Sequence, residues 1–257
     1  MGTNLSRLAG AALFAALLVS GPRAAAQSPT APAAPAAPAA AAAPAPAAPA
    51  APAAMTAPQP TVPEIFTLEG EFVRVAYNNE GFVSVGYRLA NDSVGQDWMY
   101  LVAGFTVVRP TKDYRLVREA ISLRTPDGKT VALATQKEYG EALYLGALND
   151  RAKVIRDPMN YFPVDAARPC PLQFFADLGS PGQGVSWDWV ELGWQRACTG
   201  RLFFKVPGKI QPGQYWLDVK FAASTVQVPF RIFTKDEEKV FRKKWEDFKK
   251  AHDATYK

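Results

Sequence analysis

Histidine is almost absent from this sequence, in which 257 residues include only His252, near the C-terminal end. Ser-His-Asp and Cys-His nucleophile arrangements and multi-His metal sites depend on histidine, so its scarcity excludes most of them. No Gly-rich phosphate loop and no Asp-rich calcium loop of the required spacing is present. We therefore expect no catalytic residue, no metal site and no cofactor, and we interpret His252 as an exposed surface residue.

Cysteine is also scarce, with only Cys170 and Cys198 in the chain. Their spacing is not the C-x-x-C of redox catalysis, and two thiols alone make a poor zinc site. Two cysteines in one exported domain most often pair. We predict a disulfide between them, which closes a loop worth about 3.5 kcal/mol on the chain-entropy model.

Charged and aromatic residues are missing from the stretch between Ala24 and Pro63, which is mostly Ala and Pro. Each proline removes an amide donor and fixes φ, so helix cannot propagate and extended polyproline II is favoured. Over residues 27–63 this conformation reaches at most about 115 Å, at about 3.1 Å per residue. We predict a spacer here, and the alternative is a solvated, disordered leader with no spacing role.

The first 26 residues have the pattern of a cleaved export signal. Arg7 precedes an apolar run from Leu8 to Val19, and the small residues Ala24 to Ala26 offer a cleavage site. The apolar run is shorter than the about 20 residues that cross a bilayer, although an uncleaved anchor helix is the alternative. We predict a periplasmic or secreted bacterial protein without a transmembrane segment after cleavage.

The positive charge of the chain is too small to indicate a nucleic-acid partner. The formal net charge is +5, and loss of the signal, which holds Arg7, Arg23 and no acid, lowers it to +3. A dedicated nucleic-acid binder shows basic clusters interleaved with exposed aromatic residues. We therefore expect no nucleic-acid partner.

Short runs of alternating apolar and polar residues predict an all-β domain over residues 64–233. Asn78–Gly81, Pro126–Lys129 and Ala222–Ser224 join three pairs of runs as hairpin turns, and a Thr199-Gly200 turn precedes another run. Pro229 cannot donate to a ladder, so the last strand is expected at a sheet edge. The regular spacing indicates an antiparallel β-sandwich. The runs are 72–77, 83–90, 99–109, 121–123, 131–133, 172–176, 185–192, 201–206, 215–221 and 226–232.

The strand pattern is interrupted over residues 135–169. A helix is predicted over 138–149, with Tyr139, Leu143 and Leu148 on one side, and residues 156–171 are predicted as a proline-rich loop. A long insertion inside a compact domain is either functional or poorly ordered. Its role stays open in the sequence.

Three segments carry a resemblance to a known type of domain: Asp127-Gly128-Lys129, Gly200 to Pro207, and Pro212 to Val219. Residues 66–233 resemble the secreted or periplasmic immunoglobulin-like domains of bacteria. The chain departs from antibody-type domains because no tryptophan lies midway between its two cysteines. The resemblance implies an immunoglobulin-like sandwich that serves as a binding or structural module, although fold alone does not fix function.

Trp187, Trp189 and Trp194 are the candidate binding residues. Large aromatic side chains beside polar groups suit carbohydrate or peptide binding, whereas in a sandwich they often fill the core. Asp188 and Glu191 raise the alternative of sugar hydrolysis. On a regular strand these two carboxylates point to opposite faces, which argues against a catalytic pair.

A C-terminal amphipathic helix is predicted over residues 234–257. Thr234 and Glu237 form a capping box, with acidic residues in the first turn. The helix either packs on its own sandwich or offers its apolar stripe to a protein partner, while its mixed charges argue against a membrane. The stripe consists of Phe241, Trp245 and Phe248.

Together these features predict an exported, non-catalytic β-sandwich module that acts in envelope binding or structural support. Its expected partner is an envelope protein or glycan. One alternative is a carbohydrate-binding module that uses the tryptophan cluster. The other is a hydrolase of unrecognised type, which is disfavoured because the sequence offers few residues suited to catalysis.

Overall fold

The computed structural model describes residues 62, 65–68, 70–142, 145–176 and 184–256. Its contacts divide the chain into Met1–Pro52 and Ala53–Lys257, and all described residues belong to the second unit. The predicted signal and, apart from residue 62, the predicted spacer therefore lie outside the described residues. Within the described part the chain is mostly β, with 37% of residues in strands and 24% in helices.

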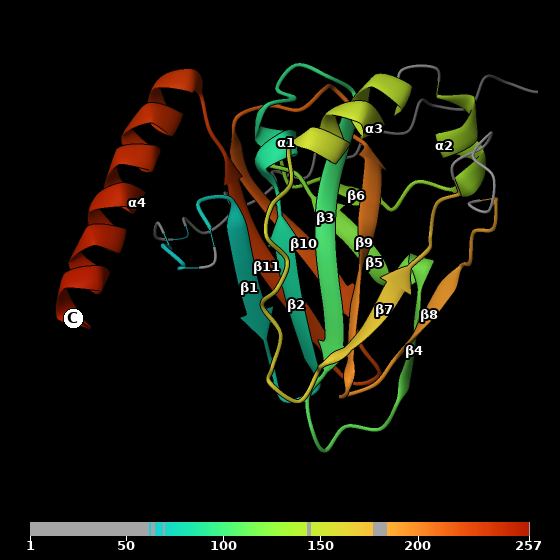
Figure 1. Ribbon diagram of the computed structural model, residues 1–257. Coiled ribbons are helices and arrows are strands. Elements are labelled where there is room, and N and C mark those ends of the chain that lie inside the picture. The colour runs from blue at the N-terminus through green and yellow to red at the C-terminus, as the bar shows by residue number, and fades with distance from the viewer. Residues whose placement is uncertain (1–61, 63–64, 69, 143–144, 177–183, 257) are drawn as a thin grey trace, which may run out of the picture. The chain divides into compact units, whose positions relative to one another are not determined.

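The described strands form three sheets (Figure 1). One has the order β1-β2-β3-β9-β7, the second β11-β10-β5-β6, and the third pairs β4 with β8. The strands are β1 (Val73–Tyr77), β2 (Gly81–Gly86), β3 (Trp98–Val107), β4 (Tyr114–Val117), β5 (Ile121–Arg124), β6 (Thr130–Ala132), β7 (Arg168–Leu172), β8 (Trp189–Leu192), β9 (Arg196–Lys205), β10 (Gly213–Lys220) and β11 (Thr225–Ile232). The helices are α1 (Arg88–Asn91), the short 3-10 helix η1 (Arg118–Ala120), α2 (Gln136–Glu141), α3 (Leu145–Val154) and α4 (Lys235–Thr255).

The hairpins predicted from turn chemistry are confirmed. β1 pairs with β2, β5 with β6, and β10 with β11, all antiparallel. Asn78 closes the first turn, because its Oδ1 accepts hydrogen bonds from the amides of Glu80 and Gly81, both at 2.9 Å. The strand with Pro229 lies at a sheet edge as expected, since β11 ends the four-stranded sheet.

A parallel pair corrects the expectation of a purely antiparallel architecture. Residues 168–172 form β7 beside β9, although their prolines indicated a loop. The Arg168 amide donates to the Gln195 carbonyl at 2.8 Å. Residues 168, 170 and 172 therefore direct their backbone groups toward β9. Pro169 and Pro171 occupy the alternate positions, whose backbone groups point away from the sheet, so the ladder does not need the amide hydrogens that they lack.

Other predicted boundaries were wrong where tertiary contacts override local signals. The strand expected to continue to residue 90 gives way to α1, and β4 was not predicted. The Thr199-Gly200 turn is absent, because β9 runs through it. Gly200 lies against β7, where an added Cβ would be 2.5 Å from the Leu172 Cβ. Two helices, α2 and α3, replace the single helix predicted over 138–149, and Leu143 lies outside the described residues.

The core lies between the five-stranded and four-stranded sheets, and β10 and β11 lie behind β1 to β3 in Figure 1. Tyr87 bridges the two layers, since its ring is 5.4 Å from Phe72 and 5.2 Å from Phe230. Burial raises the pKa of the Tyr87 hydroxyl, because the apolar core disfavours its charged form. The described part thus has one continuous apolar core with helices at its margins.

The predicted C-terminal helix is present as α4, which lies beside β1 and β11 (Figure 1). Its capping box is confirmed. The Thr234 hydroxyl accepts from the Glu237 amide at 3.3 Å, and the Glu237 carboxylate accepts from the Thr234 amide at 2.9 Å. Hydrogen bonding to the Thr234 amide and then to Arg231 lowers the pKa of Glu237.

Candidate functional site

Two of the three candidate tryptophans meet on the outward face of the β4–β8 ribbon. Trp189 begins β8 opposite Val117 of β4, and Trp187 precedes the strand by two residues. Their rings pack edge to face, with centroids 6.2 Å apart. Trp187 is 49% exposed and Trp189 37% exposed, so neither belongs to the core.

We define the tryptophan patch as Trp187, Trp189, Val117 and Arg115. The Arg115 guanidinium lies 4.1 Å from the Trp189 ring centroid, a cation–π contact that orients the indole. Val117 is also exposed and adds apolar surface beside Trp189. The patch therefore presents aromatic surface held by a paired strand, with a guanidinium at its margin.

A charged pair borders this patch along the ribbon. Glu191 pairs in register with Arg115, and its carboxylate accepts from Arg196 Nη1 at 3.0 Å. Both side chains of this ion pair are about half exposed, so water screens their attraction and leaves them free to exchange partners. Hydrogen-bonding groups thus adjoin the aromatic surface.

Asp188 is bound elsewhere, to a buried arginine behind the ribbon. Its Oδ1 accepts from Arg118 Nε at 3.2 Å, while Arg118 also donates to the carbonyls of Ala134 and Phe174. Burial lowers the pKa of Arg118, and the hydrogen bond to Asp188 counters this. Asp188 and Glu191 therefore each engage a different arginine, as their opposite strand parity suggested.

Trp194 differs from the other two candidate tryptophans in its contacts. It follows β8 in the turn to β9, is half-buried against the core, and its ring lies 4.5 Å from the Arg109 guanidinium. Its contacts are those of a packing residue. The structure thus brings together two of the three predicted tryptophans.

The apolar stripe of α4 faces residues of its own domain. Phe241 is buried, stacking on Phe233 at 4.6 Å and on Phe66 at 5.6 Å. Phe248 also stacks on Phe66, at 5.8 Å, and Trp245 Nε1 donates to a backbone carbonyl, that of Thr67, at 3.0 Å. The structure therefore shows the first of the two arrangements expected for this helix, while a role of the stripe toward a partner stays a prediction.

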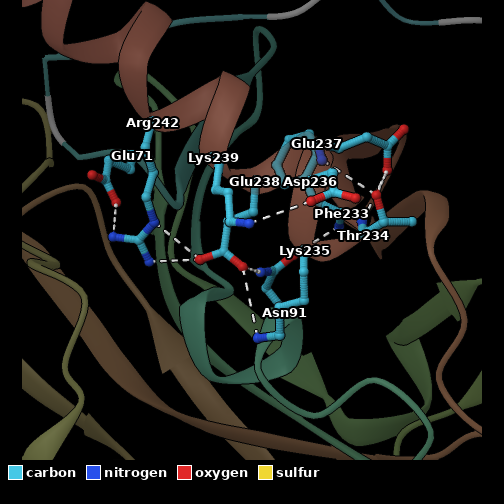
Figure 2. Close-up of polar contacts among 10 residues, drawn as sticks. All are labelled: Glu71, Asn91, Phe233, Thr234, Lys235, Asp236, Glu237, Glu238, Lys239 and Arg242. Atoms are coloured by element: carbon cyan, nitrogen blue, oxygen red, sulfur yellow. Dashed lines mark hydrogen bonds and ion pairs between the residues drawn. The ribbon is translucent and has the colours of Figure 1, made fainter.

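A polar cluster holds the start of α4, and sequence reasoning missed it. Figure 2 shows the Glu238 carboxylate between Asn91 of α1 and Arg242 of α4. Asn91 donates to Glu238 at 3.0 Å, and Arg242 donates at 2.7 Å while also pairing with Glu71 at 3.2 Å. The Glu238–Arg242 and Lys235–Glu238 pairs, four and three residues apart on a helix, are visible in the sequence, whereas the contacts with Asn91 and Glu71 are not.

The predicted disulfide is present. Cys170 of β7 and Cys198 of β9 are register partners in the parallel pair, with Cα atoms 4.1 Å apart. Cys198 is buried, so the bridge fastens the edge strand to the sheet at the core side. The bond adds a covalent link to β7, an edge strand of five residues paired on one side only.

Comparisons with known proteins add no family, since no family model, curated protein or solved structure matches this chain. Among the described residues, no group of three or more His, Cys, Asp or Glu side chains is placed to hold a metal ion. None of the helices in that part of the chain is long and apolar enough to span a membrane. The geometry of the tryptophan patch is therefore the basis for a functional assignment.

Proposed function

We propose that the protein is an exported, non-catalytic, immunoglobulin-like β-sandwich module that binds an envelope glycan through the tryptophan patch. The observation that carries the proposal is the pair of half-exposed indoles, Trp187 and Trp189, fixed on the β4–β8 ribbon. Exposed aromatic surface of this kind typically marks a binding site. The export signal and spacer predicted from the sequence would place the patch in the envelope.

The chemistry of the patch matches a sugar chain. A pyranose ring has an apolar C–H face that stacks on an indole, and its hydroxyls accept and donate hydrogen bonds at the rim. The edge-to-face arrangement turns the two indoles in different directions, 64° apart. Two successive sugars of a chain can therefore each stack on one indole. Arg115, Glu191 and Arg196 lie on the same outward face and can hydrogen-bond to the sugar hydroxyls.

Co-sedimentation with purified peptidoglycan sacculi tests this proposal, with a soluble N-acetylglucosamine trisaccharide as a second probe. We expect Trp187→Ala and Trp189→Ala each to weaken binding about tenfold or more, as loss of a central aromatic contact does. Tyr77→Ala is the matched control, because Tyr77 is a 73% exposed aromatic residue on β1, outside the patch. Binding by both tryptophan variants at the wild-type level would contradict the proposal.

Structural support is the second candidate function, favoured by the contacts of α4 with Phe66 and Thr67. These contacts fasten the C-terminal helix to the segment that follows the predicted spacer. If the folded wild-type protein binds neither sacculi nor the trisaccharide, glycan binding is overturned and structural support becomes the better proposal. The two functions are therefore separable in one assay.

A further inference from the structure

A groove lies between α3, the segment of residues 155–167 that follows it, and strands β3 and β9. Figure 1 shows α3 and this segment in front of the five-stranded sheet, away from the four-stranded sheet. The groove has a volume of about 670 Å³, within the range of small-molecule sites. We propose that it binds a small organic carboxylate that carries an apolar group. Its lining includes Val102, Asn149, Lys153, Arg156, Met159 and Arg201.

Two glycines of the sheet let the segment lie directly upon it and so form one wall. A Cβ added to Gly86 would be 2.5 Å from the Asp157 Cβ, and one added to Gly104 would be 2.6 Å from the Phe162 ring. Asp157 is further held by Arg88, whose amide and Nε donate to its carboxylate at 3.0 and 3.3 Å. These contacts do not involve a ligand, so the wall is preformed.

The charge of the groove is positive. Lys153, Arg156 and Arg201 line it together with one acid, Asp157, whose buried carboxylate already binds Arg88. Lys153 pairs with Asp150 at 2.7 Å, but both side chains are mostly exposed, so this pair exchanges at little cost. The groove therefore favours an anion.

Hydrogen bonds restrain both arginines of the groove lining. Arg201 Nη1 donates to the Asn149 Oδ1 at 3.2 Å, which ties β9 to α3. Arg156 Nε donates to the Lys153 carbonyl at 3.1 Å. Within the described residues, the terminal nitrogens of Arg156 have no hydrogen-bond partner, so its planar fork can take a carboxylate.

The remaining lining distinguishes a carboxylate with an apolar group from a bare anion. Val102 and Ala152 are apolar, and Met159 adapts its shape to irregular apolar surfaces. Inorganic phosphate gains nothing from these side chains, whereas an alkyl or aryl group buries apolar surface against them. The ligand class that uses both parts is an amphipathic monocarboxylate.

Phenylpropionate is a suitable probe, titrated into the full mature chain while backbone amide NMR shifts are recorded. We expect shifts at the groove, about tenfold weaker binding by Arg156→Gln, and a similar loss with the uncharged phenylpropionamide. Lys137→Gln is the matched control, because Lys137 is an exposed cation on α2, outside the groove, and its variant should bind as wild type does.

Several results would overturn the proposal: equal binding of acid and amide, unchanged binding by Arg156→Gln, or phosphate binding as tight as that of phenylpropionate. Shifts confined to other surfaces would also contradict it. A Trp187→Ala variant should retain carboxylate binding, because that residue lies on the β4–β8 ribbon and not in the groove. The glycan proposal and the carboxylate proposal are therefore tested independently of each other.

Discussion

Asn91 and Glu238 lie 147 residues apart in the chain and share a buried hydrogen bond of 3.0 Å, donated by the Asn91 side-chain amide. The Asn91 Oδ1 also accepts from the Phe233 amide at 2.7 Å. One side chain of α1 therefore positions both the end of the last strand and the first turns of α4. Asn91, Phe233 and Glu238 are all buried, so water is not at hand to take the place of the Asn91 side chain.

Replacing Asn91 with alanine should lower the free energy of unfolding by about 2–4 kcal/mol. The change removes a donor from the buried Glu238 carboxylate and leaves the Phe233 amide without its acceptor. Urea denaturation measures the loss. Lys239→Ala is the control on the exposed side of the same helix, expected within about 0.5 kcal/mol of wild type. Equal stability of the two variants would show that the cluster contributes nothing.

Replacing Cys198 with serine should cost about 2–5 kcal/mol, as loss of a native disulfide from an exported domain usually does. The bridge spans 28 residues and joins the edge strand β7 to β9. Thermal or urea unfolding of the variant should match that of the wild type under dithiothreitol. A free thiol in the oxidised wild-type protein, detected by labelling after denaturation, would refute the bridge itself.

The stability contributed by the Glu237 cap should depend on pH. Hydrogen bonding lowers the folded-state pKa of Glu237 below its ordinary value of 4.5, so the unfolded chain takes up the proton first as pH falls. The contribution is therefore present above pH 4.5 and is lost as pH falls through the folded pKa. Water screens the carboxylate, which is 41% exposed, so Glu237→Gln should be only about 0.5 kcal/mol less stable than wild type at pH 7 and equal to it in strong acid.

Unfolding curves recorded between pH 2 and pH 7 check the cap prediction. Glu246→Gln, an exposed position later in the same helix, is the control and should differ little from wild type at any pH. A Glu237→Gln deficit that persists unchanged into strong acid would mean that charge at this cap is irrelevant.

Two glycine substitutions should have opposite effects. Gly86→Ala places a methyl group 2.5 Å from the Asp157 Cβ, so the segment over the sheet must shift, at a cost of about 1–3 kcal/mol. Gly146→Ala in α3 meets nothing within 4 Å and should add up to about 1 kcal/mol through helix propensity. Differential scanning calorimetry of the two variants compares them, and destabilisation by both would show that space at Gly86 is not the cause.

Local pattern predicted much of the β-structure because side-chain alternation and turn chemistry act within a few residues. The hairpin of β10 and β11 and the capping box of α4 follow directly from such signals. β4 was missed because its four residues find their partner, β8, more than 70 residues later. β7 was missed because Pro169 and Pro171 argue against a strand until the edge position is known.

The candidate site was predictable from the sequence only where it depends on residues close together in the chain. The period of two over the predicted strand 185–192 places Trp187 and Trp189 on one face, whereas Trp194 lies in the turn after β8. The cluster around Glu238 depends on Asn91 and Glu71, which the fold alone brings near α4. No local signal in the sequence could reveal a contact of that separation.

The contacts of α4 with Phe66 and Thr67 bear on how the domain carries mechanical load. A pull on the chain from its N-terminal side reaches these residues before it reaches β1. Phe66 stacks on Phe248, and the Thr67 carbonyl accepts a hydrogen bond from the Trp245 indole. Such a pull therefore loads these two contacts with α4 before it loads the pairing of β1 with β2.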